Sequence, residues 1–593
     1  MGLEKLVAPM PGVVIAVQVA AKQRVRKGEP LLILEAMKME NTINSQADGV
    51  IHRVLVKEGE TVKKGQELLY FQAQEITNTT DTAVEEVDPN AIRPELKALQ
   101  DRKQYLQDEA RPAAMAKRAA RGQVSARQNL SQLCDEGTFK EYGGLVVAAQ
   151  RSRRTEEDLI QNTPADGLIS GTASINRDWF GGKLQPCLVM AYDFTVLAGT
   201  QGMFNHHKMD RMLGLAAKNK LPIVLLAEGG GGRPGDVDVQ TVAGLHIMTF
   251  YSYAQLDGIV PRISIVSGYC FAGNAALAGA SDIIIATQNS SIGMGGPAMV
   301  EGGGLGRFHP KEIGPVAVQS TNGVIDILVE DEPAAIKVAQ QYLSYFQGSL
   351  DSFQLADQQA LRQMIPQNRK RVFDLRKLIT ILADKDSVLE LGGSYAKSMY
   401  TGFIRIEGQA MGLIANDAQY EAGAITSAGA QKAARLMRIC QNFELPILSL
   451  VDTPGIMVGP TAEQTGTVRH AAELFKLGAK LKAPLFAVVL RRGYGLGAMA
   501  MTGGSFHAAD FIVAWPSGEF GAMGLEGAIK LGYRKELEAI NDPVARKARY
   551  DKMLAQAYDR GKAINMAAFL EIDDVIDPVD TRSWIASGLR NRS

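Results

Sequence analysis

The sequence predicts a small all-β domain followed by two α/β domains in which strands alternate with helices. Residues 12–36 and 49–73 are two copies of one pattern of short apolar runs and glycine turns, at a constant offset of 37. Residues 95–348 and 349–593 share a longer order of apolar strand, glycine turn and helix. Because strands that alternate with helices form parallel sheets covered by helices, the long region is expected to contain two such sheets.

The composition excludes several classes of protein. The chain has 64 basic and 64 acidic side chains, which gives no electrostatic reason to expect a nucleic-acid or membrane-surface partner. Its four cysteines lack the spacing of a metal site and are too few for a disulfide scaffold, so we expect no metal and a cytoplasmic location. The uncharged stretch 263–281 contains three glycines and an asparagine, which favour a buried strand–turn–helix over a membrane span.

The segment LEAMKMENTI lies between the two short copies. Residues 31–34 and 40–43 are expected to form the strands of a hairpin, with Met37, Lys38 and Met39 at its exposed tip. Taken alone, Lys38 would be an ordinary surface lysine. The motif EAMKME at the centre of a two-fold repeat, however, resembles the biotinyl (biotin carboxyl carrier) domain, here residues 1–74. The resemblance implies that a biotin protein ligase attaches biotin to Lys38, and Met37 and Met39 separate the motif from that of the related lipoyl domain.

Residues 75–94 are predicted to be a flexible tether. They have no apolar period and carry five acidic residues before the first basic residue, Arg93. A coil of this length spans roughly 25 Å. Such a tether would let Lys38 reach two separate sites, one for charging and one for discharge. A linker that docks rigidly is the alternative.

The two halves of the long region align on their apolar strands and glycine turns. LPIVLLAEGGGG in the first half, 95–348, matches LPILSLVDTPG in the second half, 349–593. SGYCFAGNAALAG likewise matches RGYGLGAMAMTGG, which pairs Gly268 with Gly493 and Tyr269 with Tyr494. Each half therefore resembles the spiral of βα units found in the crotonase fold.

Clusters of glycine often indicate a nucleotide-binding loop. Neither 229–235 (GGGGRPG) nor 302–304 has the ending of a P-loop or the GxGxxG spacing after a strand, so we expect no ATP or NAD site. A turn that opens onto a helix N-terminus instead presents free backbone N–H groups to a negative oxygen. Residues 271–274 offer such a turn in the first half and residues 496–498 in the second. Tight helix–strand packing is the alternative for each.

Residues 95–593 as a whole resemble the carboxyltransferase subunit of biotin-dependent acyl-CoA carboxylases. The matching motifs are RGQVSARQNLSQLCDEGTFKE, YDFTVLAGTQG, VDTPGIMVGPTAEQTGTVRH, RRGYGLGAMAM, AWPSGEFGAMGLEGA and DDVIDPVDTR. The resemblance implies that Ala272 and Gly273 hold the enolate of an acyl-CoA thioester, and that Leu496 and Gly497 hold the ureido oxygen of biotin. Ala498 is the alternative donor, because the internal repeat pairs Gly497 and Ala498 with Ala272 and Gly273.

The chain departs from the family pattern near the substrates. Members that prefer propionyl or acetyl groups carry Asp or Ile where this chain has Met499, a flexible apolar side chain that suits an adaptable acyl pocket. The sequences of these motifs resemble those of the branch of broad or long-chain acyl-CoA carboxylases, and the length of the acyl group stays open. For the basic cluster that contains Arg118 and Arg127, a role in binding CoA phosphates and a solvated helix face are both open. The expected cofactor and substrate contacts include Gly229, Gly230, Gly231, Tyr494, Met499, Arg118 and Arg127.

The chemistry implied by the resemblance needs no side-chain base. Release of carbon dioxide from N1-carboxybiotin leaves charge on the ureido oxygen, N1 takes the α-proton of the acyl-CoA, and the enolate attacks carbon dioxide. The sequence agrees, since no Ser-His-Asp set and no carboxylate pair stands out. His206, His207 and His470 lie near the motifs and are interpreted as surface or packing residues.

The partners follow from the same resemblance. We find no ATP-grasp region in these 593 residues, so a separate biotin carboxylase subunit is expected to charge the biotin. A homo-hexamer, built as a dimer of trimers, is expected, with no nucleic-acid and no membrane partner. The alternatives are a biotin-dependent decarboxylase component, a carrier or scaffold with an inactive transferase region, and a crotonase-like hydratase or thioesterase with an appended carrier.

Overall fold

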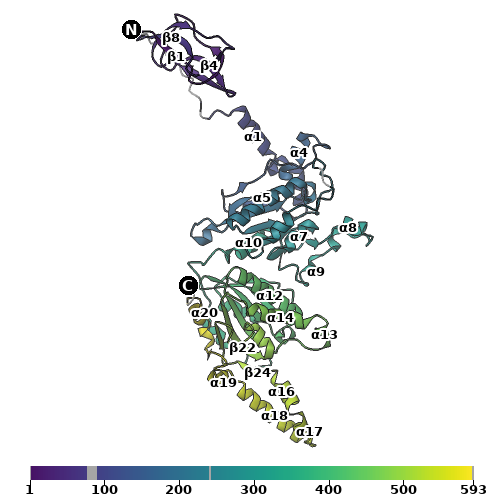
Figure 1. Ribbon diagram of the computed structural model, residues 1–593. Helices are drawn as coiled ribbons and strands as arrows, with labels where there is room; N and C mark the ends of the chain where they lie inside the picture. The colour runs from purple at the N-terminus through teal and green to yellow at the C-terminus, as the bar shows by residue number, and fades with distance from the viewer. Residues whose placement is uncertain (1, 76–87, 89, 240–241, 591–593) are drawn as a thin grey trace. The chain divides into compact units, whose positions relative to one another are not determined.

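The computed structural model describes residues 2–75, 88, 90–239 and 242–590. The chain divides into two compact units, Met1–Arg93 and Pro94–Ser593 (Figure 1). Most of the predicted tether lies outside the described residues. The predicted division of the long region at residues 348 and 349 stays a prediction.

The N-terminal unit is a small barrel of two four-stranded antiparallel sheets. One sheet has the order β1-β8-β6-β3 and the other the order β5-β4-β2-β7. Shifting the bounds of β2, β3 and β4 by 37 residues gives those of β6, β7 and β8, as the repeat predicted. The strands are β1 (Glu4–Val7), β2 (Gly12–Val17), β3 (Arg24–Val25), β4 (Pro30–Ala36), β5 (Met39–Asn44), β6 (Gly49–Val54), β7 (Thr61–Val62) and β8 (Glu67–Ala73).

Equivalent side chains of the two copies fill the core of this barrel. Val14 corresponds to Ile51 and Leu32 to Leu69, and all four side chains are fully buried. Burial of a side chain of this size contributes about 1.5–3 kcal/mol. The repeat therefore supplies one shared core from two copies, neither of which has an interior of its own.

Both halves of the C-terminal unit contain a path of seven strands with the same order and directions. The orders are β9-β10-β11-β12-β13-β15-β17 and β18-β19-β20-β21-β22-β23-β25. In each path the first three strands are antiparallel and the rest run parallel to the third. β14 and β16 form a separate two-stranded parallel sheet, and β24 pairs in parallel with the end of β22, off the main path of the second large sheet.

The strands of the first half are β9 (Lys140–Glu141), β10 (Leu168–Ser174), β11 (Pro186–Tyr192), β12 (Ile223–Leu226), β13 (Arg262–Val266), β14 (Tyr269–Phe271), β15 (Ile283–Thr287), β16 (Ser291–Gly293) and β17 (Ile327–Val329). Those of the second half are β18 (Leu389–Leu391), β19 (Met399–Ile406), β20 (Gln409–Asn416), β21 (Ile447–Thr453), β22 (Leu485–Tyr494), β23 (Phe511–Ala514), β24 (Glu519–Gly521) and β25 (Asp574–Val575).

Helices cover these sheets. In each half one long helix, α5 (Met203–Asn219) or α12 (Ser427–Asn442), packs beside the antiparallel strands, and α12 lies next to α14 (Thr467–Gly478) (Figure 1). In the part of the chain that the structure describes, no helix is long and apolar enough to span a bilayer. The other helices are α1 (Pro94–Gln104), α2 (Pro112–Ala119), α3 (Ala126–Leu133), α4 (Glu156–Asn162), α6 (Thr249–Ala254), α7 (Gly273–Gly279), α8 (Pro297–Gly302), α9 (Val316–Gln319), α10 (Glu332–Ser344), α11 (Leu375–Leu382), α13 (Pro460–Glu463), α15 (Gly495–Met501), α16 (Leu525–Gly532), α17 (Arg534–Glu538), α18 (Pro543–Arg560), α19 (Ala563–Ala568) and α20 (Thr581–Arg590).

The strand register shows which residues of the two halves correspond. Ile223 of β12 pairs with Arg262, and Ile447 of β21, which matches Ile223 in sequence, pairs with Leu485. Arg262 therefore corresponds to Leu485, an offset of 223. The neighbouring parallel pairs keep this offset, since Phe271 pairs with Gly293 where Tyr494 pairs with Gly521.

This register corrects the alignment predicted at the glycine turns. Gly268 was expected to correspond to Gly493, an offset of 225. The offset in the structure is 223, which makes Ala272 the equivalent of Gly495. Both of these residues have a left-handed backbone, with φ of 50° and 52°. The sequence alignment was wrong here because a shared Gly-Tyr dipeptide lies two residues out of structural register.

Truncating Leu34 to alanine is expected to destabilise the N-terminal unit alone. Leu34 is fully buried in the barrel, so its loss removes apolar contacts and leaves a cavity, at a cost of about 2–5 kcal/mol. Because the two units have separate apolar cores, calorimetry should show one unfolding transition lowered and the other unchanged. Ile15→Ala, at a side chain 39% exposed on the paired strand β2, is the control. A common shift of all unfolding by Leu34→Ala would contradict this expectation.

Candidate functional site

The tip of the β4–β5 hairpin is a two-residue turn formed by Met37 and Lys38. Ala36 pairs with Met39 across the hairpin, so the strands run longer than predicted and only two residues remain in the turn. Both have left-handed backbones, with φ of 54° for Met37 and 65° for Lys38, as a twist-matched hairpin turn requires. Met37 is 98% exposed and Met39 69% exposed. The three predicted residues therefore stand together at an exposed tip above a packed barrel.

The first predicted turn lies at the start of helix α7. Ala272 has φ 50° and ψ −121°, a backbone conformation that side-chain-bearing residues rarely adopt. Its N–H already donates to the carbonyl oxygen of Gly293 at 3.1 Å. Gly273 is the first residue of the helix, where backbone N–H groups have no partner within the helix. Of the two residues expected to act as donors here, Gly273 therefore has its N–H in the better position.

The run of glycines after β12 forms a wall beside this turn. Gly229 donates to Tyr269 O at 2.7 Å and Gly231 donates to Asn274 Oδ1 at 3.0 Å, while Gly230 donates to Ala198 O at 3.2 Å. A Cβ at Gly231 would lie 2.6 Å from the Cβ of Ala272, and one at Gly229 would lie 2.1 Å from Gly199 O. The N–H groups of the three glycines are used within the protein, so these residues shape the site by letting two backbones meet.

Gly273 is approached closely from its other side by residues that the sequence did not reveal. A Cβ on Gly273 would lie 2.0 Å from Oε1 of Gln201 and 3.1 Å from the ring of Phe250. Gln201 is buried and held in place because its Nε2 donates to the hydroxyl of Tyr192 at 2.9 Å. Gln201 and Phe250 lie 72 and 23 residues before Gly273 in the chain. Gln201 falls within the motif YDFTVLAGTQG, but nothing in the sequence indicated that either residue packs on Gly273.

The second predicted turn, at the start of α15, is built in the same way. A Cβ at Gly497 would lie 2.6 Å from the backbone of Gly455, so this helix also begins against another main chain. Leu496 is 61% exposed, whereas Ala498 is 1% exposed and Met499 is half-buried. In structural register Gly273 corresponds to Leu496. This equivalence favours Leu496 over Ala498 as the counterpart of the first site.

Tyr494 lies directly before this turn, and its buried side chain supports the turn. The ring is buried, at 3% exposure, and its hydroxyl donates to Glu519 Oε1 at 2.9 Å. Burial, followed by the charge of Glu519, raises the pKa of the phenol above its ordinary value. Tyr494 was expected to contact the cofactor, but the structure directs its polar end to Glu519.

A buried carboxylate anchors each of the two turns from below. Glu228, after β12, lies 2.8 Å from Arg118, and Asp452, in β21, lies 2.7 Å from Arg491 and 2.8 Å from Arg492. Burial acts to raise the pKa of Asp452, but the hydrogen bonds and charges of the two arginines outweigh it and hold the pKa below its usual value. These ion pairs fix the loops that carry the turns.

Arg118 and Arg127 were expected to bind CoA phosphates, and the structure shows both guanidiniums engaged in ion pairs within the protein. Arg118 is 6% exposed, and its guanidinium contacts Glu228 at 2.8 Å and Glu332 at 3.1 Å. Arg127 makes a bidentate ion pair with Glu141, with N–O distances of 3.0 and 3.1 Å. Removing a partner from such a buried pair leaves an uncompensated charge. Both arginines therefore have structural partners, and their contact with CoA stays a prediction.

Several members of the same basic cluster, Arg118 among them, line a cavity of about 700 Å³. Lys117 and Arg121 are exposed at its edge, and the guanidinium of Arg121 lies 5.9 Å from the ring of Phe194. The Phe194 ring lies 6.4 Å from Tyr269, which stacks on Phe271 at 5.9 Å. Because Phe271 precedes Ala272, side-chain contacts lead from this cavity to the first turn.

The histidines near the motifs do not form an acid–base set. His206 is buried, and its Nδ1 lies 3.0 Å from the hydroxyl of Thr249. Burial lowers the pKa of His206, which favours the neutral ring. His207 is exposed, and His470 contacts Gln431 at 2.9 Å. These positions agree with packing and surface roles.

Comparison with known proteins extends these observations. Residues 117–591 match the carboxyl transferase domain family, and residues 4–71 match the biotin-requiring enzyme family. The methylmalonyl-CoA carboxyltransferase 12S subunit of Propionibacterium freudenreichii subsp. shermanii is 30% identical over 501 residues, 83% of this chain and 93% of its own. The propionyl-CoA carboxylase carboxyltransferase subunit of Haloferax mediterranei is 29% identical over 490 residues, 79% of this chain and 90% of its own.

Two solved structures are similar along most of the chain. A single-chain, multi-domain long-chain acyl-CoA carboxylase is 48% identical with a TM-score of 0.80; the match covers 99% of this chain and 56% of that one. The transcarboxylase 12S hexamer, with methylmalonyl-CoA bound, is 28% identical with a TM-score of 0.74; the match covers 84% of this chain and 96% of that one. These likenesses confirm the predicted crotonase-like fold. The chain therefore belongs to the carboxyl transferase family, as a biotin-dependent acyl-CoA carboxyltransferase with a biotin-requiring domain at residues 4–71.

Proposed function

We propose that biotin attached to Lys38 delivers its carboxyl group to the α-carbon of an acyl-CoA bound at the Gly273 turn. The observation that carries this proposal is the pair of equivalent helix starts, α7 and α15, each packed closely against a neighbouring segment: Gly273 against Gln201, and Gly497 against the backbone of Gly455. Each turn directs main-chain N–H groups toward one place, where a negative oxygen would be stabilised by the amides and the helix dipole.

The residues at the hairpin tip fit a covalently attached biotin. A two-residue turn presents Lys38 to solvent, and the packed barrel beneath it keeps the tip in one conformation. When bound, biotin supplies a ureido nitrogen that carries the carboxyl group and a ureido oxygen that takes up negative charge on release. The exposed Met37 and Met39 flank the lysine and offer apolar contacts to a ligase.

The two turns would divide the charge stabilisation between two oxygens. We propose that the Gly273 N–H binds the thioester oxygen as it becomes an enolate, and that the N–H groups of Leu496 and Gly497 bind the ureido oxygen. A single preorganised donor of this kind is worth about 3 kcal/mol in a water-poor site. No side chain is required to remove the α-proton, which agrees with the burial and hydrogen bonding of His206.

We propose that Lys117 and Arg121 bind the phosphates of CoA. Both are exposed at the cavity that leads to the first turn, and Phe194 offers a ring between them and the turn. Unlike Arg118 and Arg127, neither cation makes an ion pair within the part of the chain that the structure describes. They replace those two arginines as the candidates for this role.

We propose the acyl specificity and the partners from the similarity of this chain to solved structures. The solved structure that is 48% identical is described as a long-chain acyl-CoA carboxylase, and Met499 gives the second turn an adaptable apolar neighbour, so we propose a long-chain or broad acyl specificity. A separate ATP-dependent biotin carboxylase would charge the biotin, and a hexamer like that of transcarboxylase 12S would form. Assays of a panel of acyl-CoAs with a cognate biotin carboxylase test the first point; carboxylation of biotin by this chain alone would contradict the second.

Lys38→Arg is expected to abolish covalent biotin and carboxyl transfer together. Arginine keeps the positive charge at the hairpin tip but offers no amine for the ligase. Mass spectrometry of protein made in cells with an active ligase measures the adduct. The control is Lys22→Arg, at another exposed lysine of the barrel with a left-handed backbone, which should stay fully biotinylated. An adduct that persists in Lys38→Arg would refute the assignment.

Gly273→Ala is expected to lower kcat by about 10² to 10³ while the protein stays folded. The new Cβ would meet Gln201 Oε1 at 2.0 Å, so the first turn must shift and its N–H leaves the thioester oxygen. The control is Gly279→Ala in the same helix, where a Cβ meets nothing within 4 Å. Steady-state kinetics, with circular dichroism as a folding check, give the comparison. Equal activities of the two variants would argue against the Gly273 donor.

Lys117→Ala is expected to raise the KM for the acyl-CoA about tenfold with little change in kcat. An interaction with the CoA phosphates is made equally in the ground and transition states, so its loss weakens binding without slowing chemistry. Lys183→Ala, at an exposed lysine outside the cavity, is the control. A KM equal to that of the unaltered chain would contradict the assignment.

A further inference from the structure

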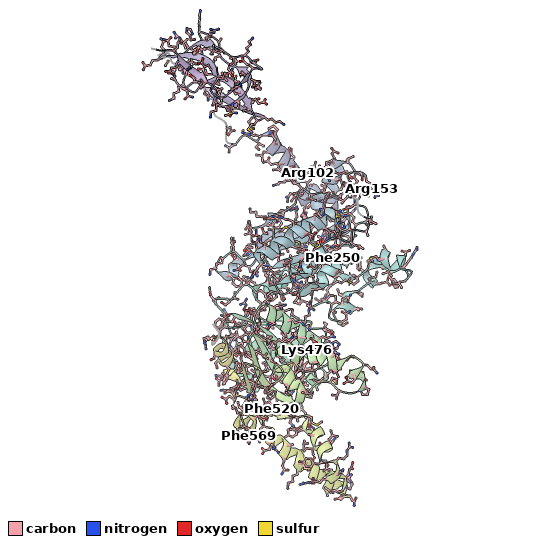
Figure 2. All side chains as sticks on the ribbon, in the orientation of Figure 1. Arg102, Arg153, Phe250, Lys476, Phe520 and Phe569 are labelled. Carbon is pink, nitrogen blue, oxygen red and sulfur yellow. The ribbon has the colours of Figure 1, made fainter. Side chains whose placement is uncertain are left out.

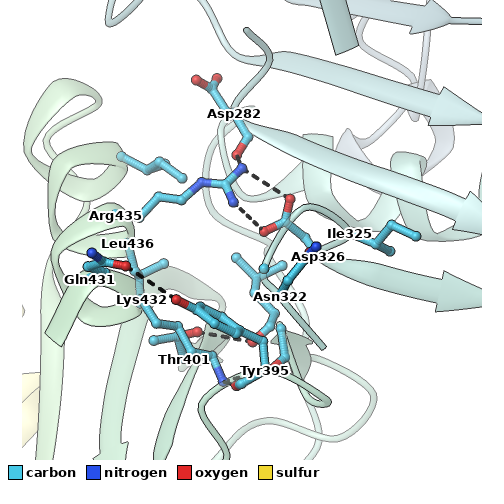
Figure 3. A pocket seen from close by; sticks show the side chains of 14 residues that line it. Asp282, Asn322, Ile325, Asp326, Tyr395, Thr401, Gln431, Lys432, Arg435 and Leu436 are labelled. Atoms are coloured by element: carbon cyan, nitrogen blue, oxygen red, sulfur yellow. Dashed lines mark hydrogen bonds and ion pairs between the residues drawn. The ribbon is translucent and has the colours of Figure 1, made fainter. Parts of the chain in front are cut away.

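The junction between the two halves of this chain centres on one ion pair. Arg435 of α12 contacts Asp326, which precedes β17, with Nη1–Oδ1 at 2.8 Å and Nη2–Oδ2 at 3.1 Å (Figure 3). Nη2 also donates to the carbonyl oxygen of Asp282 at 2.6 Å, and Gly392 N donates to the carbonyl oxygen of Asp326 at 2.7 Å. The first half thus presents an acidic edge, and the second half presents an α12 wall that receives it.

The second half has the same acidic edge at its own end. Asp573 precedes β25 as Asp326 precedes β17. Asp326 Oδ2 accepts from Ile284 N at 2.8 Å, and Asp573 Oδ2 accepts from Ile512 N at 2.7 Å, in the equivalent place. Asp573 differs in one respect, because it is exposed and has no arginine beside it among the described residues. The second half therefore ends in an acidic edge. The equivalent edge of the first half, at Asp326, is already packed against α12.

The first half likewise has its own copy of the receiving wall. Lys432 of α12 is buried and donates to Met399 O; Lys208 of α5, which is 224 residues earlier, is buried and donates to Leu168 O, at the equivalent start of β10. The same offset of 224 places Arg211 on Arg435. Two helices with the same buried lysine therefore carry an arginine one turn later, facing the same side.

The wall of the first half forms a cavity of about 410 Å³ that contains Arg211. It is lined mainly by apolar side chains, among them Tyr142, Val146, Phe204 and Met212. Arg211 is exposed and makes no hydrogen bond or ion pair with any residue that the structure describes. We call this cavity the α5 pocket. It is the equivalent of the cavity in Figure 3, without the edge that covers it there.

The loop before Asp573 complements the α5 pocket in size. Within the chain, Gly323 lies against Tyr395, since a Cβ on Gly323 would be 2.8 Å from the Tyr395 ring. The equivalent of Gly323 is Leu570; both have left-handed backbones, with φ of 87° and 56°. The equivalent of Tyr395 is Val146, because the N–H groups of both bond to the glycine three residues earlier. Within the chain the small Gly323 faces the large Tyr395. At the equivalent positions the larger Leu570 would face the smaller Val146.

The same loop is unusually apolar for an exposed segment. Phe569 is 81% exposed and Leu570 is 66% exposed (Figure 2). Large apolar side chains left in water at one point commonly mark an interface. We call residues 569–573 the apolar loop.

We infer that the apolar loop of one copy of this chain inserts into the α5 pocket of a second copy, with Asp573 paired to Arg211. The contact would reproduce between two copies the junction that Arg435 and Asp326 form within one. The two surfaces differ, so each copy uses its loop on one neighbour and its pocket on another. Such head-to-tail contacts close into a ring when the rotation permits. This inference deepens the assembly part of the proposed function and is independent of its catalytic part.

Charge reversal across this contact tests the inference. Sedimentation velocity of the full chain is expected to show a multimer of the 63.9 kDa protein. Arg211→Glu and Asp573→Arg should each weaken self-association at least about tenfold, because each places like charges together. The double variant R211E/D573R restores opposite charges and should recover assembly. Lys57→Glu, the same reversal on the N-terminal barrel, should have no effect.

A third variant separates loss of the contact from loss of the fold. Leu570→Gly relieves a left-handed backbone while it removes the apolar contact, so it should weaken assembly without lowering the melting temperature. A wild-type chain that is monomeric at every concentration, single reversals that leave assembly unchanged, or a double variant that is not restored would each overturn the inference. The measurement uses no acyl-CoA and no biotin, so a failure of carboxyl transfer in an intact multimer would count against the proposed function alone.

Discussion

The site depends on a constraint of space, namely that two helices begin where neighbouring atoms leave no room for a further side chain. At the first turn Gly231 lies against Ala272, and at the second Gly455 lies against Gly497. This close packing holds the amide groups at both helix starts in place. A donor that is fixed before the reaction costs no reorganisation during it, which is the property that electrostatic catalysis requires. The strained backbone of Ala272 belongs to the same arrangement.

Duplication explains both the likeness and the division of labour between the halves. Each half buries a lysine against carbonyl oxygens and ties an arginine to a glutamate at its first strand, as Arg127 does with Glu141 and Arg376 with Glu390. These shared contacts hold one scaffold twice. The halves differ where the substrates would bind: the first has a glycine wall and an adjoining cavity with exposed cations, and the second has an exposed leucine and Met499. One fold could then serve two oxygens in a single reaction.

Sequence reasoning succeeded where spacing was regular and failed where distant segments meet. The offset of 37 predicted that the two barrel copies would have matching strands. The strand–turn–helix order predicted the parallel part of each large sheet but not its antiparallel strands. The alignment at the turns was wrong by two residues, because a Gly-Tyr dipeptide matched more strongly than the strands that fix the register. Arg118 was taken for a phosphate ligand because its carboxylate partner Glu332 is more than two hundred residues away. Gln201 belongs to the motif YDFTVLAGTQG, but the motif did not show that its side chain packs on Gly273, 72 residues away.

The most direct test of the account is a structure of the biotinylated chain with an acyl-CoA analogue that cannot form an enolate. The thioester oxygen is expected within about 3 Å of the Gly273 amide nitrogen, with the α-carbon open toward the turn that carries Leu496. Density for the thioester away from both turns, or beside a carboxylate or histidine placed to take its α-proton, would contradict it.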